Sequence, residues 1–105
     1  ESDNLVIYSS SGFSPGELTV EVGETVTFIN ESSQGMWVAT DLHPTHRNYS
    51  GTSLSEHCKD GESNTFDACR DIPSGESWIF TFDKPGEWSY HNHSSARDTG
   101  VIIVR

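Results

Sequence analysis

The sequence is short of basic residues, of long hydrophobic runs and of helical periodicity. Only 6 Lys and Arg stand against 16 Asp and Glu among 105 residues, which gives a formal net charge of −10 with histidine neutral. Nucleic acids and anionic membranes bind clustered positive charge, so we expect neither as a partner. The longest apolar run, Val101–Val104, falls far short of the ~18 residues of a membrane span, and no such span is expected.

Cysteine is scarce as well, and its spacing excludes the common thiol motifs. Cys58 and Cys69 lie eleven positions apart, unlike C-x-x-C redox or zinc patterns. Both belong to a polar stretch, Leu42–Ile72, and a loop of this length is usually functional or held by a cross-link. We therefore predict a Cys58–Cys69 disulfide, and with it an oxidising compartment: periplasmic, secreted or cell-surface. A metal thiolate site that combines the cysteines with His57 is the alternative.

The sequence is rich in short segments in which hydrophobic and polar residues alternate. Such alternation places hydrophobic side chains on one face of a β-strand. The segments contain many β-branched and aromatic residues and are bounded by turn-forming residues, with turns expected at 21–24 and 83–86. Seven strands are expected, near residues 5–8, 18–22, 25–30, 36–40, 78–82, 86–90 and 101–104. The predicted fold class is all-β: a Greek-key antiparallel β-sandwich, a single domain over 1–105 with a long disulfide-pinned loop.

Histidine stands out, because four of the five histidines form two close pairs. His43 and His46 belong to the segment His-Pro-Thr-His, in which the proline ring restricts the backbone between the two imidazoles. His91 and His93 flank one residue at the end of a predicted strand, so both side chains project to one face, about 7 Å apart at ~3.3 Å per residue. Imidazole is the commonest side-chain ligand of metals such as copper and zinc. The two pairs together predict a metal site.

Several segments resemble the cupredoxin family of small copper proteins. They are Gly12–Pro15, Leu18–Asn30, Gly75–Phe82, Pro85–His91 and Gly100–Val104. More narrowly, the chain is similar to plastocyanin-like, single-domain proteins that carry an HPTH segment and a Tyr-His-x-His segment. The resemblance implies a cupredoxin-like sandwich, copper as the cofactor, and a redox or copper-delivery protein as a partner.

The chain departs from the blue-copper members of that family where their thiolate ligand is expected. By the resemblance this position falls at Asn92, and the last loop has neither cysteine nor methionine. The copper–thiolate bond determines the colour and redox tuning of blue copper, so we expect no type 1 centre. The histidine pairs are instead similar to the His-Cys-His and His-Pro-x-His segments of multicopper oxidases. That similarity implies an all-histidine copper site.

The function expected from the sequence is therefore copper binding outside the cytoplasm at an all-histidine, type 2-like site. The role is copper binding or delivery, or electron transfer, and an oligomer is compatible with it. Because only neutral imidazole binds a metal, copper affinity should fall as pH drops through ~6.5.

Two alternatives to this function stay open, although the sequence favours binding over catalysis. One is a copper-dependent redox enzyme, in which an open coordination position is assisted by Asp41 or Asp98 as acid or base. The other is a metal-free structural or interaction module, in which the histidines are polar surface residues.

Overall fold

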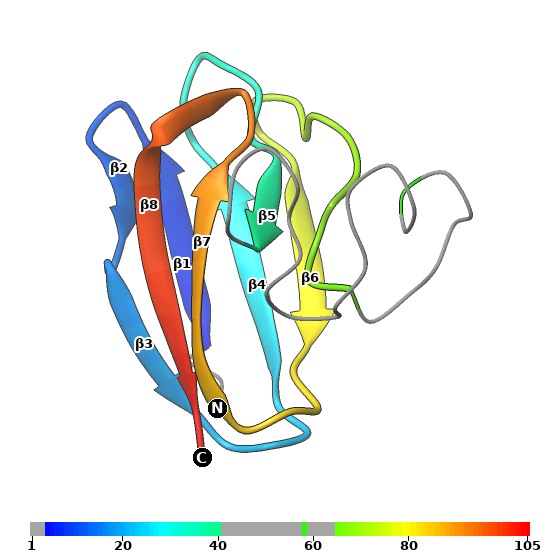
Figure 1. Ribbon diagram of the computed structural model, residues 1–105. Coiled ribbons are helices and arrows are strands. Elements are labelled where there is room, and N and C mark those ends of the chain that lie inside the picture. The colour runs from blue at the N-terminus through cyan, green and yellow to red at the C-terminus, as the bar shows by residue number, and fades with distance from the viewer. Residues whose placement is uncertain (1–3, 41–57, 59–64) are drawn as a thin grey trace.

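The computed structural model describes residues 4–40, 58 and 65–105, in which eight strands form two four-stranded sheets. The first sheet has the order β2-β1-β4-β6 and contains β1 (Leu5–Ser9), β2 (Gly12–Ser14), β4 (Thr25–Asn30) and β6 (Ser77–Thr81). The second has the order β3-β8-β7-β5 and contains β3 (Glu17–Val20), β5 (Val38–Thr40), β7 (Gly86–Asn92) and β8 (Ser95–Val104). The two sheets pack face to face (Figure 1), which confirms the predicted all-β sandwich.

The alternation in the sequence becomes the two faces of each strand. Val6 of β1 and Phe28 of β4 are fully buried, and Ile102 of β8 meets them from the other sheet in the same core. The predicted turns are also present. At residues 21–24 the N–H of Glu24 donates to the carbonyl of Glu21 at 3.0 Å, and residues 83–85 connect β6 to Gly86, the first residue of β7. In the part of the chain that the structure describes, no helix is long and apolar enough to cross a membrane.

Two strand pairs are parallel, a feature that alternation alone does not reveal. The chain leaves the first sheet after β2 and enters the second as β3, with Pro15 and Gly16 between the two strands. Because β3 continues in the direction of β2, the turn that follows it returns β4 parallel to β1. The same switch places β3 parallel to the last strand, with Glu17 opposite Val101.

Part of the stretch predicted as a polar loop contributes to the core. Phe66 and Ile72 are fully buried, and their backbones form hydrogen bonds with β5 and with the segment just before it. The N–H of Thr40 donates to the carbonyl of Phe66 at 2.9 Å, and the N–H of Ala68 donates to the carbonyl of Val38 at 2.8 Å. Residues 66–68 thus extend the sheet beyond β5, on the side of β5 away from β7.

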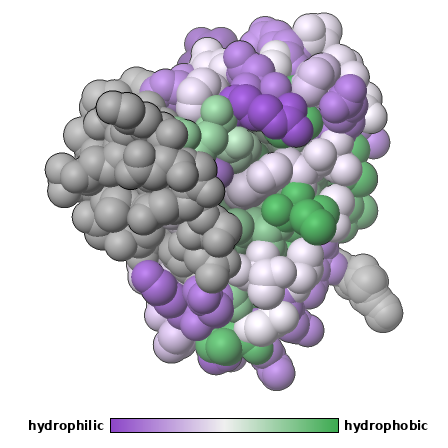
Figure 2. Space-filling view, turned by 90° about the vertical axis from the view of Figure 1, so that its right-hand side faces the viewer, coloured by the Kyte–Doolittle hydropathy of each residue, from purple (hydrophilic) through white to green (hydrophobic). Residues whose placement is uncertain are grey.

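The outer face of the first sheet carries no charged side chain on β1, β4 or β6. The outward-facing residues of these three strands are Leu5, Ile7, Ser9, Thr25, Thr27, Ile29, Ser77, Ile79 and Thr81. Ile79 is 62% exposed, and Figure 2, which views the molecule from the side of β6, shows hydrophobic atoms among weakly polar ones. The net charge of −10 is therefore carried by other parts of the surface.

Tyr90 occupies the centre of the core, with its hydroxyl group against Gly100. The hydroxyl is buried and makes no hydrogen bond within the described part of the chain, and a Cβ atom at Gly100 would clash with its oxygen. Glycine is thus required opposite this tyrosine. Burial raises the pKa of Tyr90, because the phenolate would be desolvated there.

We expect Tyr90→Phe to raise the free energy of unfolding at pH 7 by about 1 kcal/mol, because it removes a buried polar group that lacks a partner. The raised pKa adds a pH dependence: the wild type loses stability as pH rises above ~10, where the unfolded tyrosine ionises first, and the variant loses less. Urea unfolding at pH 7 and in alkaline buffer measures both effects. Tyr8→Phe is the control and should destabilise, since the Tyr8 hydroxyl donates to Oδ2 of Asp98 at 2.5 Å. A Tyr90→Phe variant less stable than wild type at pH 7 would contradict the expectation.

Candidate metal centre

The structure describes two of the four predicted metal ligands and brings them together at the end of β7. His91 is the next-to-last residue of the strand and is only 1% exposed. His93 is half-buried in the turn that joins β7 to β8. The centroids of the two imidazole rings are 6.2 Å apart, with their planes at 50°. The other predicted ligands, His43 and His46, lie outside the described residues.

Asn92, between the two histidines, has a structural role that the sequence did not indicate. Its Oδ1 accepts hydrogen bonds from the backbone N–H groups of Trp37 at 2.8 Å and Ser94 at 3.1 Å, and its Nδ2 donates to the carbonyl of Gly35 at 3.1 Å. The side chain is fully buried. An amide side chain both donates and accepts, which a cysteine at this position would do only weakly. Asn92 therefore fixes the backbone of the histidine turn to the segment that precedes β5.

The turn is held by three further contacts. The N–H of His93 donates to the carbonyl of Trp37 at 2.8 Å, and the Trp37 ring lies against the His93 ring at a centroid distance of 4.6 Å. The hydroxyl of Ser94 donates to the carboxylate of Asp71. The position of His93 thus depends on residues from two other parts of the chain. The contact between Trp37 and His93 was not predicted, because nothing local in the sequence relates the two residues.

The separation of the two imidazole rings matches the distance that a shared metal ion requires. A metal–nitrogen bond of ~2.0–2.1 Å places an ion about 3 Å from the centre of a coordinating imidazole ring. Rings whose centroids are 6.2 Å apart are therefore within reach of a single ion. The nitrogen donors of His91 and His93 suit copper, zinc or nickel, and two nitrogens leave room for additional ligands.

The two cysteines form the predicted disulfide. The Cys58–Cys69 bond has a Cα–Cα distance of 5.4 Å, and no free cysteine remains in the chain. Ligand atoms of Cys58, Asp67 and Cys69 lie within 4.8 Å of one another. Sulfurs bonded to each other are not thiolates, so this group is not a metal site. The alternative of a thiolate site with His57 is therefore wrong.

Of the two carboxylates considered for acid–base assistance, Asp98 is already engaged by Tyr8. Burial raises the pKa of the Tyr8 hydroxyl, and its hydrogen bond to Asp98 adds to the increase. A neutral phenol therefore donates to the Asp98 carboxylate. Asp41 lies outside the described residues.

Comparison with known proteins identifies the architecture. No family model matches the chain, and neither does any curated protein. Solved structures match along nearly its whole length: the purple cupredoxin from Nitrosopumilus maritimus superposes with a TM-score of 0.73 at 17% sequence identity, covering 98% of this chain and 100% of that one. This protein has the cupredoxin fold. An oxidised variant of amicyanin gives the same TM-score of 0.73 at 20% identity, covering 100% of this chain and 86% of its own.

A Cu(I) form of another amicyanin variant, solved at pH 4, superposes with a TM-score of 0.69 at 20% identity over 100% of this chain and 86% of its own. The resemblance to cupredoxins drawn from the sequence is thus confirmed for the fold. At these identities the likeness does not extend to individual ligands. In this chain β7 ends in His91 and Asn92, His93 follows in the turn, and the two cysteines are joined elsewhere in a disulfide.

Proposed function

We propose that this cupredoxin-fold protein binds one copper ion through His91 and His93, with His43, His46 or both completing an all-histidine, type 2-like site. The observation that carries the proposal is the 6.2 Å separation of the His91 and His93 rings at the end of β7. His91 lies within β7 and His93 in the turn that follows it, and the buried Asn92 between them anchors that turn.

The chemistry of the site follows from its donors. Neutral imidazole nitrogens bind both oxidation states of copper, and bound copper supplies a one-electron couple. A site without thiolate reorganises more between Cu(I) and Cu(II) than a blue site does, which favours copper binding and delivery over fast electron transfer. The −10 charge attracts cations and favours a redox or copper-delivery partner with a basic surface.

The setting of the proposed function is extracytoplasmic. A disulfide such as Cys58–Cys69 forms and persists in oxidising compartments, which supports a periplasmic, secreted or cell-surface location. Residues 1–105 are proposed to act as a single domain, because the two sheets share one hydrophobic core.

Titration of the metal-free protein with Cu²⁺ tests this function. We expect one equivalent to bind tightly by calorimetry, with an EPR spectrum of the type 2 kind that shows nitrogen splitting and no intense blue absorption. A blue, type 1 spectrum would contradict the all-histidine site. The absence of tight binding would contradict the function as a whole.

A further inference from the structure

We infer that Trp37 is a positioning residue for the copper site, and that Asp67 and the disulfide segment hold its indole in place against His93. Its effect on copper rests on the proposed function. The contacts that hold Trp37 in place are present in the protein without metal. The positioning of Trp37 and the binding of copper can therefore be tested separately.

The first contact joins Trp37 to the histidine turn. The indole and imidazole centroids are 4.6 Å apart at an interplanar angle of 55°, so the His93 ring rotates freely only if the indole moves away. The backbones are joined as well, because the N–H of His93 donates to the carbonyl of Trp37 at 2.8 Å. Trp37 therefore determines both the position of the His93 backbone and the orientation of its ring.

The second contact fixes the indole itself. Its Nε1–H donates to Oδ1 of Asp67 at 2.7 Å, and the Asp67 side chain is only 7% exposed. A hydrogen bond to a carboxylate is shorter and stronger than one between neutral groups, and a buried carboxylate depends on such donors. The Trp37–Asp67 pair is thus a rigid link rather than a surface contact.

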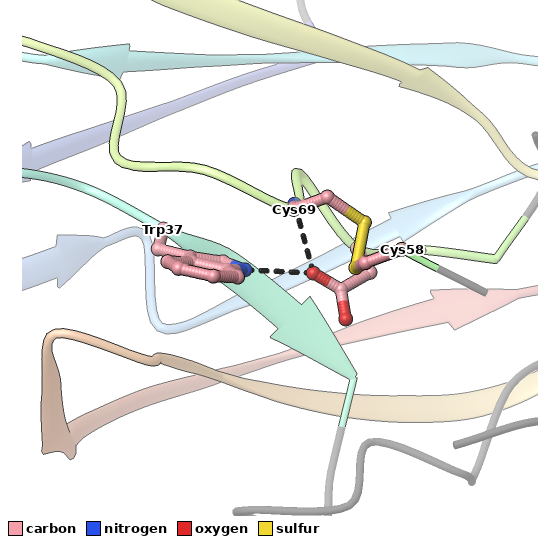
Figure 3. The surroundings of a disulfide bond; sticks show 4 residues. Trp37, Cys58 and Cys69 are labelled. Atoms are coloured by element: carbon pink, nitrogen blue, oxygen red, sulfur yellow. Dashed lines mark hydrogen bonds between the residues drawn. A yellow bond between two sulfur atoms is a disulfide. The ribbon is translucent and has the colours of Figure 1, made fainter. Parts of the chain in front are cut away.

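The third contact ties Asp67 to the disulfide. The same Oδ1 accepts the backbone N–H of Cys69 at 2.9 Å, as Figure 3 shows, and Cys69 is bonded to Cys58. Cys69 has a φ of 61°, a left-handed conformation that is uncommon for residues other than glycine. The cross-link and this carboxylate both hold the backbone at Cys69. A continuous series of contacts therefore runs from the disulfide through Asp67 and Trp37 to the metal-binding ring of His93.

The chain offers a matched control for Trp37. Trp88 lies on β7, the strand that carries His91, and its Nε1–H also donates a hydrogen bond, to the carbonyl of Lys84 at 2.9 Å. That bond is exposed, whereas the acceptor of the Trp37 bond is a buried carboxylate. Substitution of Trp88 removes an indole of the same chemistry from the strand without touching His93.

The metal-free protein tests the link directly. In ¹⁵N–¹H spectra we expect the indole N–H of Trp37 to exchange with solvent much more slowly than that of Trp88. Asp67→Ala should abolish this protection, while Asp67→Asn, which keeps an oxygen acceptor, should retain part of it. Equal exchange of the two indole groups in the wild type, or unchanged protection in Asp67→Ala, would overturn the inference.

Copper titration of the same variants tests the consequence for the site. Loss of groups that orient metal ligands typically lowers metal affinity 10–100-fold, and we expect about a tenfold loss, with altered copper hyperfine splitting in EPR, for Trp37→Leu. Trp37→Phe, which keeps a ring against His93, should lose less, and it serves as the readout if the leucine variant does not fold. Trp88→Leu should match the wild type. Wild-type affinity and EPR spectra in both Trp37 variants would overturn the inference, whereas a wild type that binds no copper would overturn the proposed function.

Discussion

The double substitution His91→Ala/His93→Ala is expected to abolish tight copper binding, with a loss of affinity of more than ~100-fold. Even groups that only orient a ligand change metal affinity 10–100-fold, and this substitution removes two proposed ligands outright. Each single substitution, His91→Ala or His93→Ala, also removes one of two neighbouring nitrogen ligands, because the two rings are 6.2 Å apart. Calorimetric titration with Cu²⁺ at pH 7 measures the loss.

Two further variants make this test specific to the ligands. His91 is only 1% exposed, so its alanine variant also leaves a cavity, and His91→Gln keeps most of the volume while removing the imidazole. Ser89→Ala changes the same face of β7 two residues earlier and should bind copper as the wild type does. Thermal unfolding of each variant establishes that it is folded. Unchanged affinity in a folded double variant would contradict the assignment of both ligands.

Phe66→Ala is expected to lower the free energy of unfolding by about 3–5 kcal/mol, as is typical when a buried phenylalanine is truncated. The Phe66 side chain is completely buried, and its ring packs against those of Phe82 at 4.7 Å, Phe80 at 5.2 Å and Tyr90 at 5.7 Å. Its removal leaves a cavity among these rings. Such a loss is a large fraction of the ~5–15 kcal/mol that stabilises most small domains.

Urea unfolding of this variant measures the change. Ile79→Ala provides the comparison: its side chain is 62% exposed on the outer face of β6, and it should change the free energy of unfolding by less than ~0.5 kcal/mol. A Phe66→Ala variant that loses less than ~1 kcal/mol would contradict the central position of this ring in the core.

Local pattern was sufficient to predict most of the sandwich. Alternation identified the strands whose inward residues, such as Val6, Phe28 and Ile102, form the core. The strand β2 was missed because Gly12–Ser14 is too short for any period to emerge. The parallel pairs were missed for a different reason: strand direction in a sheet depends on where the chain changes sheets, and no residue pattern encodes that.

In and around the candidate site, too, some features could be predicted from the sequence and others only from the fold. The pairing of Cys58 with Cys69 followed from their position in a long polar stretch, and the structure confirms it. The burial of Phe66 in the same stretch could not be predicted. One aromatic residue among polar neighbours carries no periodicity, and only tertiary packing reveals its burial. The bond between Trp37 and Asp67 joins residues thirty positions apart and is likewise a product of the fold.

The structure describes only two of the four proposed copper ligands. His91 and His93 lie together at the end of β7, and the proposal of copper binding starts from them. His43 and His46 lie outside the described residues, so their participation stays a prediction. Copper titration of His43→Ala and of His46→Ala, each with His91 and His93 intact, would show which of them completes the site.

The parallel pairing of β3 with β8 also has a consequence for how the chain folds. Glu17 lies beside Val101 although most of the chain separates them, and β7 reaches β3 only through β8. Pairings between distant segments cost loop-closure entropy before they bring any stabilisation, and they slow folding. The second sheet cannot close until its last strand has been synthesised. The sandwich is therefore completed only after β8 has joined it, and the histidine turn, which precedes β8, acquires its final geometry at that step.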